Sequence, residues 1–209
     1  MSGQRAKAVV FDIGNVLIEW QPERHYDAVI GESRRKALFE AVDLHAVNDE
    51  VDRGGDMGTL FEELARSTPE WAEEIRMWHG DWIKMASPAI PRSVRLQRRL
   101  RQKGVPVHAL SNFGIGTFQK AQAAYDFLSE FDQPYISGHL GVIKPDARIY
   151  EILEEGTGLS GAEILFTDDR EDNIAAAQAR GWQTHHFTGP EGWADRLVAD
   201  GFLTAEEAA

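Results

Sequence analysis

An apolar segment that ends on an acid places the strongest constraint on how this chain folds. Residues 8–12 read Ala-Val-Val-Phe-Asp, and Gly14 and Asn15 follow as a turn signal. Such a run predicts a strand buried on both faces of a parallel sheet, with the Asp12 carboxylate at its tip. Because burial of an unpaired carboxylate is costly, we expect a cation, a metal ion or both close to Asp12.

The composition is that of a globular protein without a membrane partner. The 209 residues are 43% hydrophobic, and no apolar run approaches the length that crosses a bilayer. There is no Cys, so disulfides, thiolate catalysis and cysteine-based zinc sites are excluded. A net charge of −12 argues against nonspecific nucleic-acid binding, which depends on many Lys and Arg contacts. The polar start without a secretory signal predicts a cytoplasmic location; the oligomeric state is not determined by the sequence.

The segment after the first strand has a different pattern. From residue 20 to residue 87 the pattern is helical, with no convincing strand, which predicts an all-helical insertion. We therefore expect a core domain of residues 1–19 and 88–209, and a helical cap domain of residues 20–87.

Three helix signals lie within this insertion. Residues 34–42 carry the first, Thr59 and Glu62 form a capping-box pattern that opens the second, and Thr68-Pro69 opens the third. An apolar stripe at helical spacing follows on the third helix and is typical of a packed helix–helix interface. Its members are Trp71, Ile75, Trp78 and Trp82.

Strand and helix patterns alternate in the second half of the chain. Strands are expected over residues 105–112, 135–141, 163–169 and 183–187, with helical patterns between them. This alternation predicts an α/β fold, a Rossmann-like parallel sheet flanked by helices and joined by right-handed crossovers.

Polar residues stand at or just beyond the carboxyl ends of the predicted strands, where an open parallel sheet binds ligands. They are Asp12, Ser111, Asn112, Lys144, Asp168 and Asp169. Three acids so close together would repel one another unless a divalent cation with oxygen ligands were present, and Mg²⁺ is the usual choice. Lys144 would balance the remaining charge and hold an anion.

These motifs resemble those of the haloacid dehalogenase-like hydrolases, over essentially the whole chain. Residues 11–17 are similar to the first motif of that family, Leu110-Ser111-Asn112 to the second, Lys144-Pro145 to the third, and residues 166–169 with Asn173 to the fourth. The helical insertion resembles the small cap of the family's first subclass. The Asp-x-Gly-Asn-Val form of the first motif resembles a branch that includes glucose-1-phosphate phosphatases.

The resemblance implies a two-step reaction. Asp12 would attack an electrophile and form a covalent aspartyl intermediate, which water then hydrolyses. Ser111 would hydrogen-bond a phosphoryl oxygen, and Lys144 would neutralise charge on the nucleophile and on the transferring group.

The resemblance also implies a metal site and substrate contacts. The expected Mg²⁺ ligands are Asp12, Asp169 and the carbonyl of Gly14, with Asp168 either ligating the ion or holding a metal-bound water. The expected substrate contacts are the backbone amides near Ile13 and Gly14, Asn112, and Arg53 in a loop of the insertion.

One position departs from the family pattern. Most phosphatases of the family carry a second Asp two residues after the nucleophile as general acid and base, and this chain has Gly14 there. Glycine offers a carbonyl but no proton. Candidate substitutes are Asn15, Glu19, His45 and His79, and none stands out from the sequence.

Three functions remain open from the sequence. The leading one is a Mg²⁺-dependent phosphatase that hydrolyses a small phosphorylated metabolite, for which a sugar phosphate is one candidate. A 2-haloacid dehalogenase would also use Asp12 but would need no metal, and therefore would not need the paired acids Asp168-Asp169. The third is a ligand-binding protein of the same fold that has lost turnover, a reading motivated by Gly14.

Overall fold

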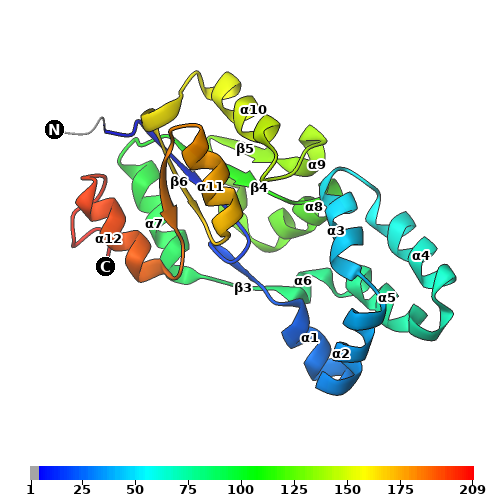
Figure 1. Ribbon diagram of the computed structural model, residues 1–209. Helices are drawn as coiled ribbons and strands as arrows, with labels where there is room; N and C mark the ends of the chain where they lie inside the picture. Colours follow the sequence, from blue (N-terminus) through cyan, green and yellow to red (C-terminus); the bar gives the residue numbers. More distant parts are fainter. Residues whose placement is uncertain (1–4) are drawn as a thin grey trace.

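A five-stranded parallel sheet organises residues 5–209, the part of the chain that this computed structural model describes (Figure 1). The strand order is β5-β4-β1-β6-β7, and every neighbouring pair is parallel. The strands are β1 (Ala8–Phe11), β4 (Val107–Ser111), β5 (Gln133–Ile136), β6 (Ile164–Asp168) and β7 (Gln183–His186). The central position of β1 explains its continuous apolar sequence, and the predicted parallel α/β fold is confirmed.

Helices cover both faces of the sheet because neighbouring residues of a strand point in opposite directions. Val10 packs with residues of α10 and α11, whereas Val9 and Phe11 belong to a cluster that includes α7, α8 and α12. The Phe11 ring meets Trp193 of α12 edge to face at 5.5 Å. The helices are α7 (Pro91–Gln102), α8 (Ile115–Ala124), α9 (Ser137–Leu140), α10 (Ala147–Thr157), α11 (Glu171–Ala179) and α12 (Pro190–Ala199), with single 3-10 turns at Asp126–Ser129 and Gly161–Glu163.

The segment between β1 and α7 forms a helical unit on one side of the molecule (Figure 1). Its helices are α1 (Pro22–Ile30), α2 (Glu32–Ala41), α3 (Leu44–Asp52), α4 (Met57–Ser67), α5 (Ala72–Gly80) and α6 (Trp82–Met85), with a 3-10 turn at Pro69–Trp71. A short antiparallel ribbon of β2 (Ile18–Trp20) and β3 (Ala86–Ala89) closes this segment at its base. The sequence did not predict the ribbon, since strands of three or four residues are too short for a periodic signal. The expected domain boundaries fall within it, and the division into two domains stays a prediction.

Three local predictions were wrong. The capping residue of α4 is Asp56, whose carboxylate accepts from the Thr59 amide at 2.8 Å, so Thr59 lies inside the helix. The predicted stripe is divided among three elements, because Trp71 ends the 3-10 turn Pro69–Trp71, α5 runs from Ala72 to Gly80, and Trp82 belongs to α6. The strand expected over residues 135–141 ends at 136, where α9 begins. Trp78 is nevertheless fully buried, as expected for a core position.

Glycines allow the helical unit to lie against the loop that follows β4. A Cβ on Gly114 would come within 2.5 Å of the Val51 side chain, and one on Gly54 within 2.8 Å of the Gly138 carbonyl. A Cβ on Gly138 would itself meet Phe113 O at 2.7 Å and Ile115 N at 2.8 Å. These approaches place the end of α3 beside the carboxyl end of β4. None of the helices in residues 5–209 combines the length and hydropathy needed to span a bilayer.

Gly138→Ala tests this close packing. Because the new methyl group meets backbone atoms that cannot rotate away, we expect the free energy of unfolding to fall by about 1–3 kcal/mol. The matched control is Gly116→Ala in the exposed part of α8, where no atom lies within 4 Å of the added Cβ. That variant should be about 0.5–1 kcal/mol more stable than the parent. Urea denaturation measures both, and equal stability of the two variants would contradict the packing described here.

Candidate active site

The carboxyl ends of three adjacent strands bring Asp12, Ser111 and Asp168 together. Ser111 Oγ donates to Asp12 Oδ1 at 2.6 Å. Lys144, from the loop between α9 and α10, places its Nζ 2.9 Å from the same Asp12 oxygen and 2.5 Å from Asp168 Oδ2. Ser111 and Lys144 thus act on one oxygen of Asp12, and Oδ2 accepts no hydrogen bond from any described side chain.

The charges in this group are almost completely removed from water. Asp168 is 0% exposed, Lys144 3% and Asp12 7%. Burial alone would lower the pKa of Lys144, but Asp12 and Asp168 outweigh it and raise that pKa, so the ammonium stays charged. Burial raises the pKa of Asp12, Lys144 opposes this, and Asp168 and Asp169 raise it further. One ammonium is therefore too little positive charge for three carboxylates.

Asp168 is fixed by protein donors on both of its oxygens. Asp168 Oδ2 accepts a hydrogen bond from Lys144 Nζ, and Oδ1 accepts one from the backbone N–H of Arg170 at 2.8 Å. Asn173 Nδ2 donates to both oxygens, at 3.0 and 3.1 Å. Asn173 stands in the first turn of α11 and is 2% exposed. With these partners, Asp168 holds Lys144 in position.

Asn15 links the turn after β1 to Asp169. Its backbone has a φ of 53°, in the left-handed region that Asn tolerates better than most residues. Its Nδ2 donates to Asp169 Oδ2 at 3.0 Å, while its Oδ1 accepts from the Trp20 amide at 2.9 Å. Asn15 was one candidate from the sequence for the missing acid; in the structure its side-chain amide positions Asp169.

Asn112 holds the main chain of Lys144 in a reciprocal pair. Asn112 Nδ2 donates to Lys144 O at 3.0 Å, and Lys144 N donates to Asn112 Oδ1 at 2.8 Å. Asn112 also lines the cavity described below, so the predicted substrate contact and this positioning role involve the same side chain.

The other predicted substrate contacts are placed differently. Ile13 is fully buried, and its carbonyl accepts from Leu17 N at 2.8 Å, so only its amide is left to meet a substrate. Gly14 lines the cavity, and a Cβ built on it would meet nothing within 4 Å. Arg53 pairs with Glu50 at 3.3 Å and is not among the residues that line the cavity; its contact with substrate stays a prediction.

A cavity of about 360 Å³ opens over Asp12, Lys144 and Asp169. The helical unit and the ribbon supply much of its remaining wall, which is partly aromatic and partly acidic. These lining residues are Ile18, Glu19, Trp20, His45, Asn48, Asp49, Asp52, Trp82 and Ala86. Sequence reasoning missed Asp52 altogether; the only signal was an Asn and an Asp four residues apart on one helix face, Asn48 and Asp52.

The acids at the cavity floor fit a divalent cation. One carboxylate oxygen from each of Asp12, Asp168 and Asp169 lies within 4.8 Å of the others. An all-oxygen donor set with an excess of negative charge suits Mg²⁺, which binds through one or two carboxylates and retains waters. Since Asp168 already has a protein donor on each oxygen, Asp12 and Asp169 are the better placed direct ligands.

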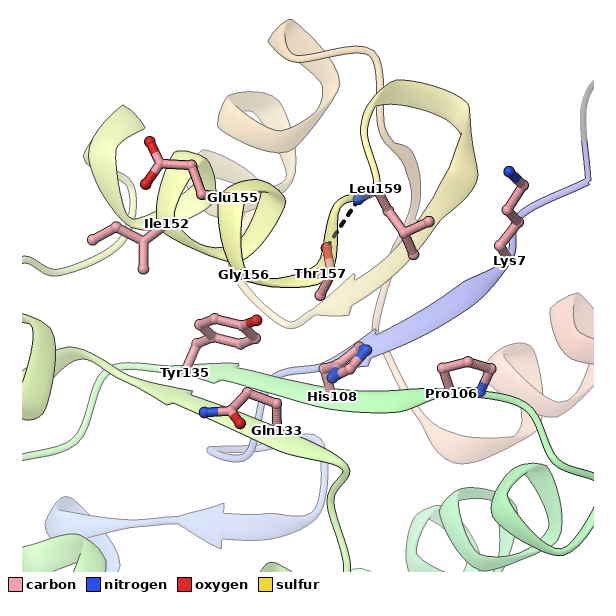
Figure 2. Close-up of a pocket in the computed structure, with 10 residues that line it drawn as sticks. All are labelled: Lys7, Pro106, His108, Gln133, Tyr135, Ile152, Glu155, Gly156, Thr157 and Leu159. Carbon is pink, nitrogen blue, oxygen red and sulfur yellow. Dashed lines mark hydrogen bonds between the residues drawn. The ribbon is translucent and has the colours of Figure 1, made fainter.

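A larger cavity of about 790 Å³ lies elsewhere, at the amino ends of the strands (Figure 2). Figure 2 shows His108 on β4 and Tyr135 on β5 facing α10, with Gln133 beside them on β5 and Lys7 at the far end. None of the acids from the strand ends reaches it. Ligand chemistry in an open parallel sheet belongs to the carboxyl ends, so the smaller cavity is the candidate active site.

Comparison with known proteins agrees with this fold. The family model described as haloacid dehalogenase-like hydrolase matches residues 6–181, and the chain belongs to this family of hydrolases.

Two curated relatives carry different activities in their names. The chain is 27% identical to the sesquiterpene phosphatase astK of Aspergillus oryzae over 87% of this chain and 90% of that protein. It is 28% identical to an (S)-2-haloacid dehalogenase of Pseudomonas fluorescens, over 49% of this chain and 45% of that protein.

A solved structure shares the fold. The HAD family enzyme bt-2542 of Bacteroides thetaiotaomicron superposes with a TM-score of 0.72 at 20% identity, over 93% of this chain and 99% of that one. The same bacterial enzyme has also been solved with magnesium and inorganic phosphate.

Lys144→Met tests the charge balance of the buried group. Removing the ammonium leaves Asp12 and Asp168 buried without compensation, so the free energy of unfolding in EDTA should fall by about 3–5 kcal/mol. Mg²⁺ should then raise the melting temperature more in this variant than in the parent, because the ion meets a more negative site. Calorimetry with and without Mg²⁺ measures both effects.

The matched control is Lys120→Met, which removes an exposed lysine whose Nζ lies 3.5 Å from a backbone carbonyl. Its stability should change by less than about 0.5 kcal/mol. A Lys144→Met protein as stable as this control in EDTA would show that the buried ion pairs do not support the fold.

Proposed function

We propose that this protein is a Mg²⁺-dependent phosphatase that hydrolyses a small phosphorylated metabolite through an aspartyl-phosphate intermediate on Asp12. The observation that carries the proposal is the pairing of one buried nucleophile candidate with two kinds of positive charge. Lys144 lies 2.9 Å from Asp12, and the acids Asp168 and Asp169 create a site for a cation beside it. A dianionic phosphate group needs both.

The roles of the side chains follow from their contacts. Asp12 attacks phosphorus through Oδ2, while Ser111 and Lys144 hold the other carboxylate oxygen. As the bond from Asp12 to phosphorus forms, the bond from phosphorus to the leaving oxygen breaks, and the alcohol leaves. The Lys144 ammonium neutralises charge on the phosphoryl group during this step, which lowers the barrier in a water-poor site. Water then attacks phosphorus, the bond to Asp12 breaks, and phosphate leaves. Asp12 and Asp169 would hold Mg²⁺, which would supply further positive charge to stabilise the phosphoryl group.

The cavity wall favours a substrate that is small and both apolar and hydroxylated. Its volume of about 360 Å³ is at the lower end of the range for metabolite pockets. Trp20 and Trp82, whose rings are 5.7 Å apart, present an aromatic wall, and Glu19 and Asp49 offer carboxylates to hydroxyl groups. A sugar phosphate, with apolar ring faces and hydroxyl edges, is the candidate that these features support.

A 2-haloacid dehalogenase is the competing function, supported by the match to a dehalogenase over about half of the chain. Attack on carbon by Asp12 would expel halide without a proton donor or a metal. The cluster of Asp12, Asp168 and Asp169 argues against this reaction, because without a metal ion three acids share the single positive charge of Lys144, and the remaining negative charge would repel the carboxylate of a haloacid. A protein that binds ligands without turnover is the third alternative.

A screen of small phosphates and 2-haloacids tests these alternatives. We expect phosphate release with Mg²⁺, loss of it in EDTA, and a drop of at least about a thousandfold in Asp12→Asn, because the amide cannot act as the nucleophile. Asp172→Asn is the matched control, since Asp172 is an exposed acid of α11 that pairs with Arg170.

The opposite results separate the alternatives. Phosphate release that survives EDTA or the loss of the Asp12 carboxylate would contradict the proposed mechanism. Halide release without metal would establish the dehalogenase, and a folded protein silent in both assays would favour ligand binding without turnover.

Binding of Mg²⁺ can be measured without turnover. Asp169→Asn should weaken Mg²⁺ binding at least about tenfold in isothermal titration calorimetry, because an amide oxygen replaces a charged ligand in a site that has few. Glu171→Gln, an exposed acid in the first turn of α11, is the control and should bind as the parent does. Equal Mg²⁺ affinities for the parent and both variants would show that Asp169 is not a ligand of the ion.

A further inference from the structure

The proposed reaction lacks a proton donor among the residues at the sheet. Expulsion of an alkoxide from a phosphate ester is slow unless an acid protonates the leaving oxygen. The side chains at the cavity floor are occupied: Lys144 is paired with two carboxylates, Asn15 bonds Asp169, and Gly14 has no side chain. The donor must come from the wall that the helical unit provides.

Three titratable side chains of that wall are poorly suited to this task. Glu19 already forms an ion pair with Arg24 at 2.6 Å. The His45 side chain is 52% exposed, and Asp49 is also exposed to solvent. His79, the remaining candidate from the sequence, is not among the residues that line the cavity.

Asp52 has the required placement. It lies in the last turn of α3, is 9% exposed, and lines the same cavity as Asp12. The close approach of Val51 to Gly114 places this turn against the loop that follows Ser111 and Asn112. A carboxyl group of the helical unit thereby faces the same cavity as the nucleophile candidate of the sheet.

The hydrogen bonds of Asp52 leave its proton available. Trp78 Nε1 donates to Asn48 Oδ1 at 3.1 Å, which turns the Asn48 amide group so that its Nδ2 donates to Asp52 Oδ2 at 3.0 Å. The second partner, the Gly114 backbone N–H, is also a donor. Both partners are donors, so neither can accept the proton of a neutral Asp52. That proton is therefore available for transfer to a group in the cavity.

The surroundings of Asp52 also favour a neutral carboxyl group near pH 7. Burial is the largest influence and, with the negative charges of Asp49 and Asp12, raises the pKa of Asp52 to about 7, against the lowering by Gly114 and Arg53. An acid with a pKa close to the working pH is the most effective proton donor.

We propose that Asp52 is the general acid of the reaction and supplies from the helical unit the proton that position 14 cannot. This inference rests on the proposed phosphatase function. As Asp12 bonds to phosphorus, the phosphorus–oxygen bond to the leaving group breaks, its electron pair goes to that oxygen, and the oxygen takes the proton of Asp52. The Asp52 carboxylate then takes a proton from the water that attacks the aspartyl phosphate. The bond to Asp12 breaks, phosphate leaves, and both side chains regain their starting forms.

The dependence of rate on the leaving group tests this role. The probes are p-nitrophenyl phosphate, phenyl phosphate and glycerol phosphate, whose leaving oxygens need progressively more help from an acid. Asp52→Asn keeps the shape and the acceptor oxygen but not the proton. We compare kcat/KM, which reports on phosphoryl transfer to Asp12 and not on the later hydrolysis that all three esters share. In Asp52→Asn we expect kcat/KM for p-nitrophenyl phosphate to stay within about fivefold of the parent, and kcat/KM for glycerol phosphate to fall at least about a hundredfold.

Two further variants separate chemistry from structure. Asp49→Asn removes a charge from the same helix. Whatever its effect on the rate itself, the rate of this variant should depend on the leaving group as weakly as that of the parent does. Gly14→Asp has room for its side chain, since a Cβ there meets nothing within 4 Å. Combined with Asp52→Asn, it should restore at least about tenfold of the lost rate on glycerol phosphate by providing a proton donor from the sheet.

The outcomes distinguish this inference from the proposed function. An active parent whose Asp52→Asn variant loses the same factor in kcat/KM on all three esters, or loses nothing, would overturn the role of Asp52 alone. A parent that hydrolyses none of the esters with Mg²⁺ would contradict the proposed function and this inference together. Melting temperatures of the variants, measured in parallel, show whether a uniform loss reflects unfolding.

Discussion

The buried ammonium of Lys144 between Asp12 and Asp168 is the interaction on which the rest of the site depends. Carboxylates that are at most 7% exposed would repel one another and lose their hydration without compensation. Lys144 supplies one positive charge, and its own position is set from three directions, by Asp12, by Asp168 and by the reciprocal bonds to Asn112. The negative charge that Lys144 leaves uncompensated makes the site suited to a divalent cation.

The parallel sheet brings these residues together although they are not close in the sequence. Because β4, β1 and β6 are neighbours and run in the same direction, residues at their carboxyl ends meet although they are far apart in the chain. The residues around them act mainly by orienting: Asn173 holds Asp168, Asn15 holds Asp169, and Asn112 holds Lys144. Three asparagines thus fix charged groups without adding charge of their own.

The helical unit completes the site rather than merely covering it. Its aromatic side chains bury a cluster around Trp78, and the indole N–H of that residue begins the hydrogen-bond chain that runs through Asn48 to Asp52. Core packing of the insertion and the orientation of a carboxyl group in the cavity are therefore connected. The short ribbon of β2 and β3 and the glycine contacts at Gly54, Gly114 and Gly138 set where this unit meets the sheet.

The sequence by itself determined the parallel α/β fold and the convergence of Asp12, Ser111, Lys144, Asp168 and Asp169, because strand-end positions follow from local pattern and from the direction of parallel strands. It also predicted an insertion built from helices. It did not show the ribbon, the start of α4 at Asp56, or the break between α5 and α6, since these depend on contacts of a few residues. Only the tertiary structure placed Asp52 beside the cavity and Arg53 away from it. Adjacent residues on one helix point in different directions, and which of them meets the site depends on how closely α3 packs against a loop more than fifty residues away in the chain.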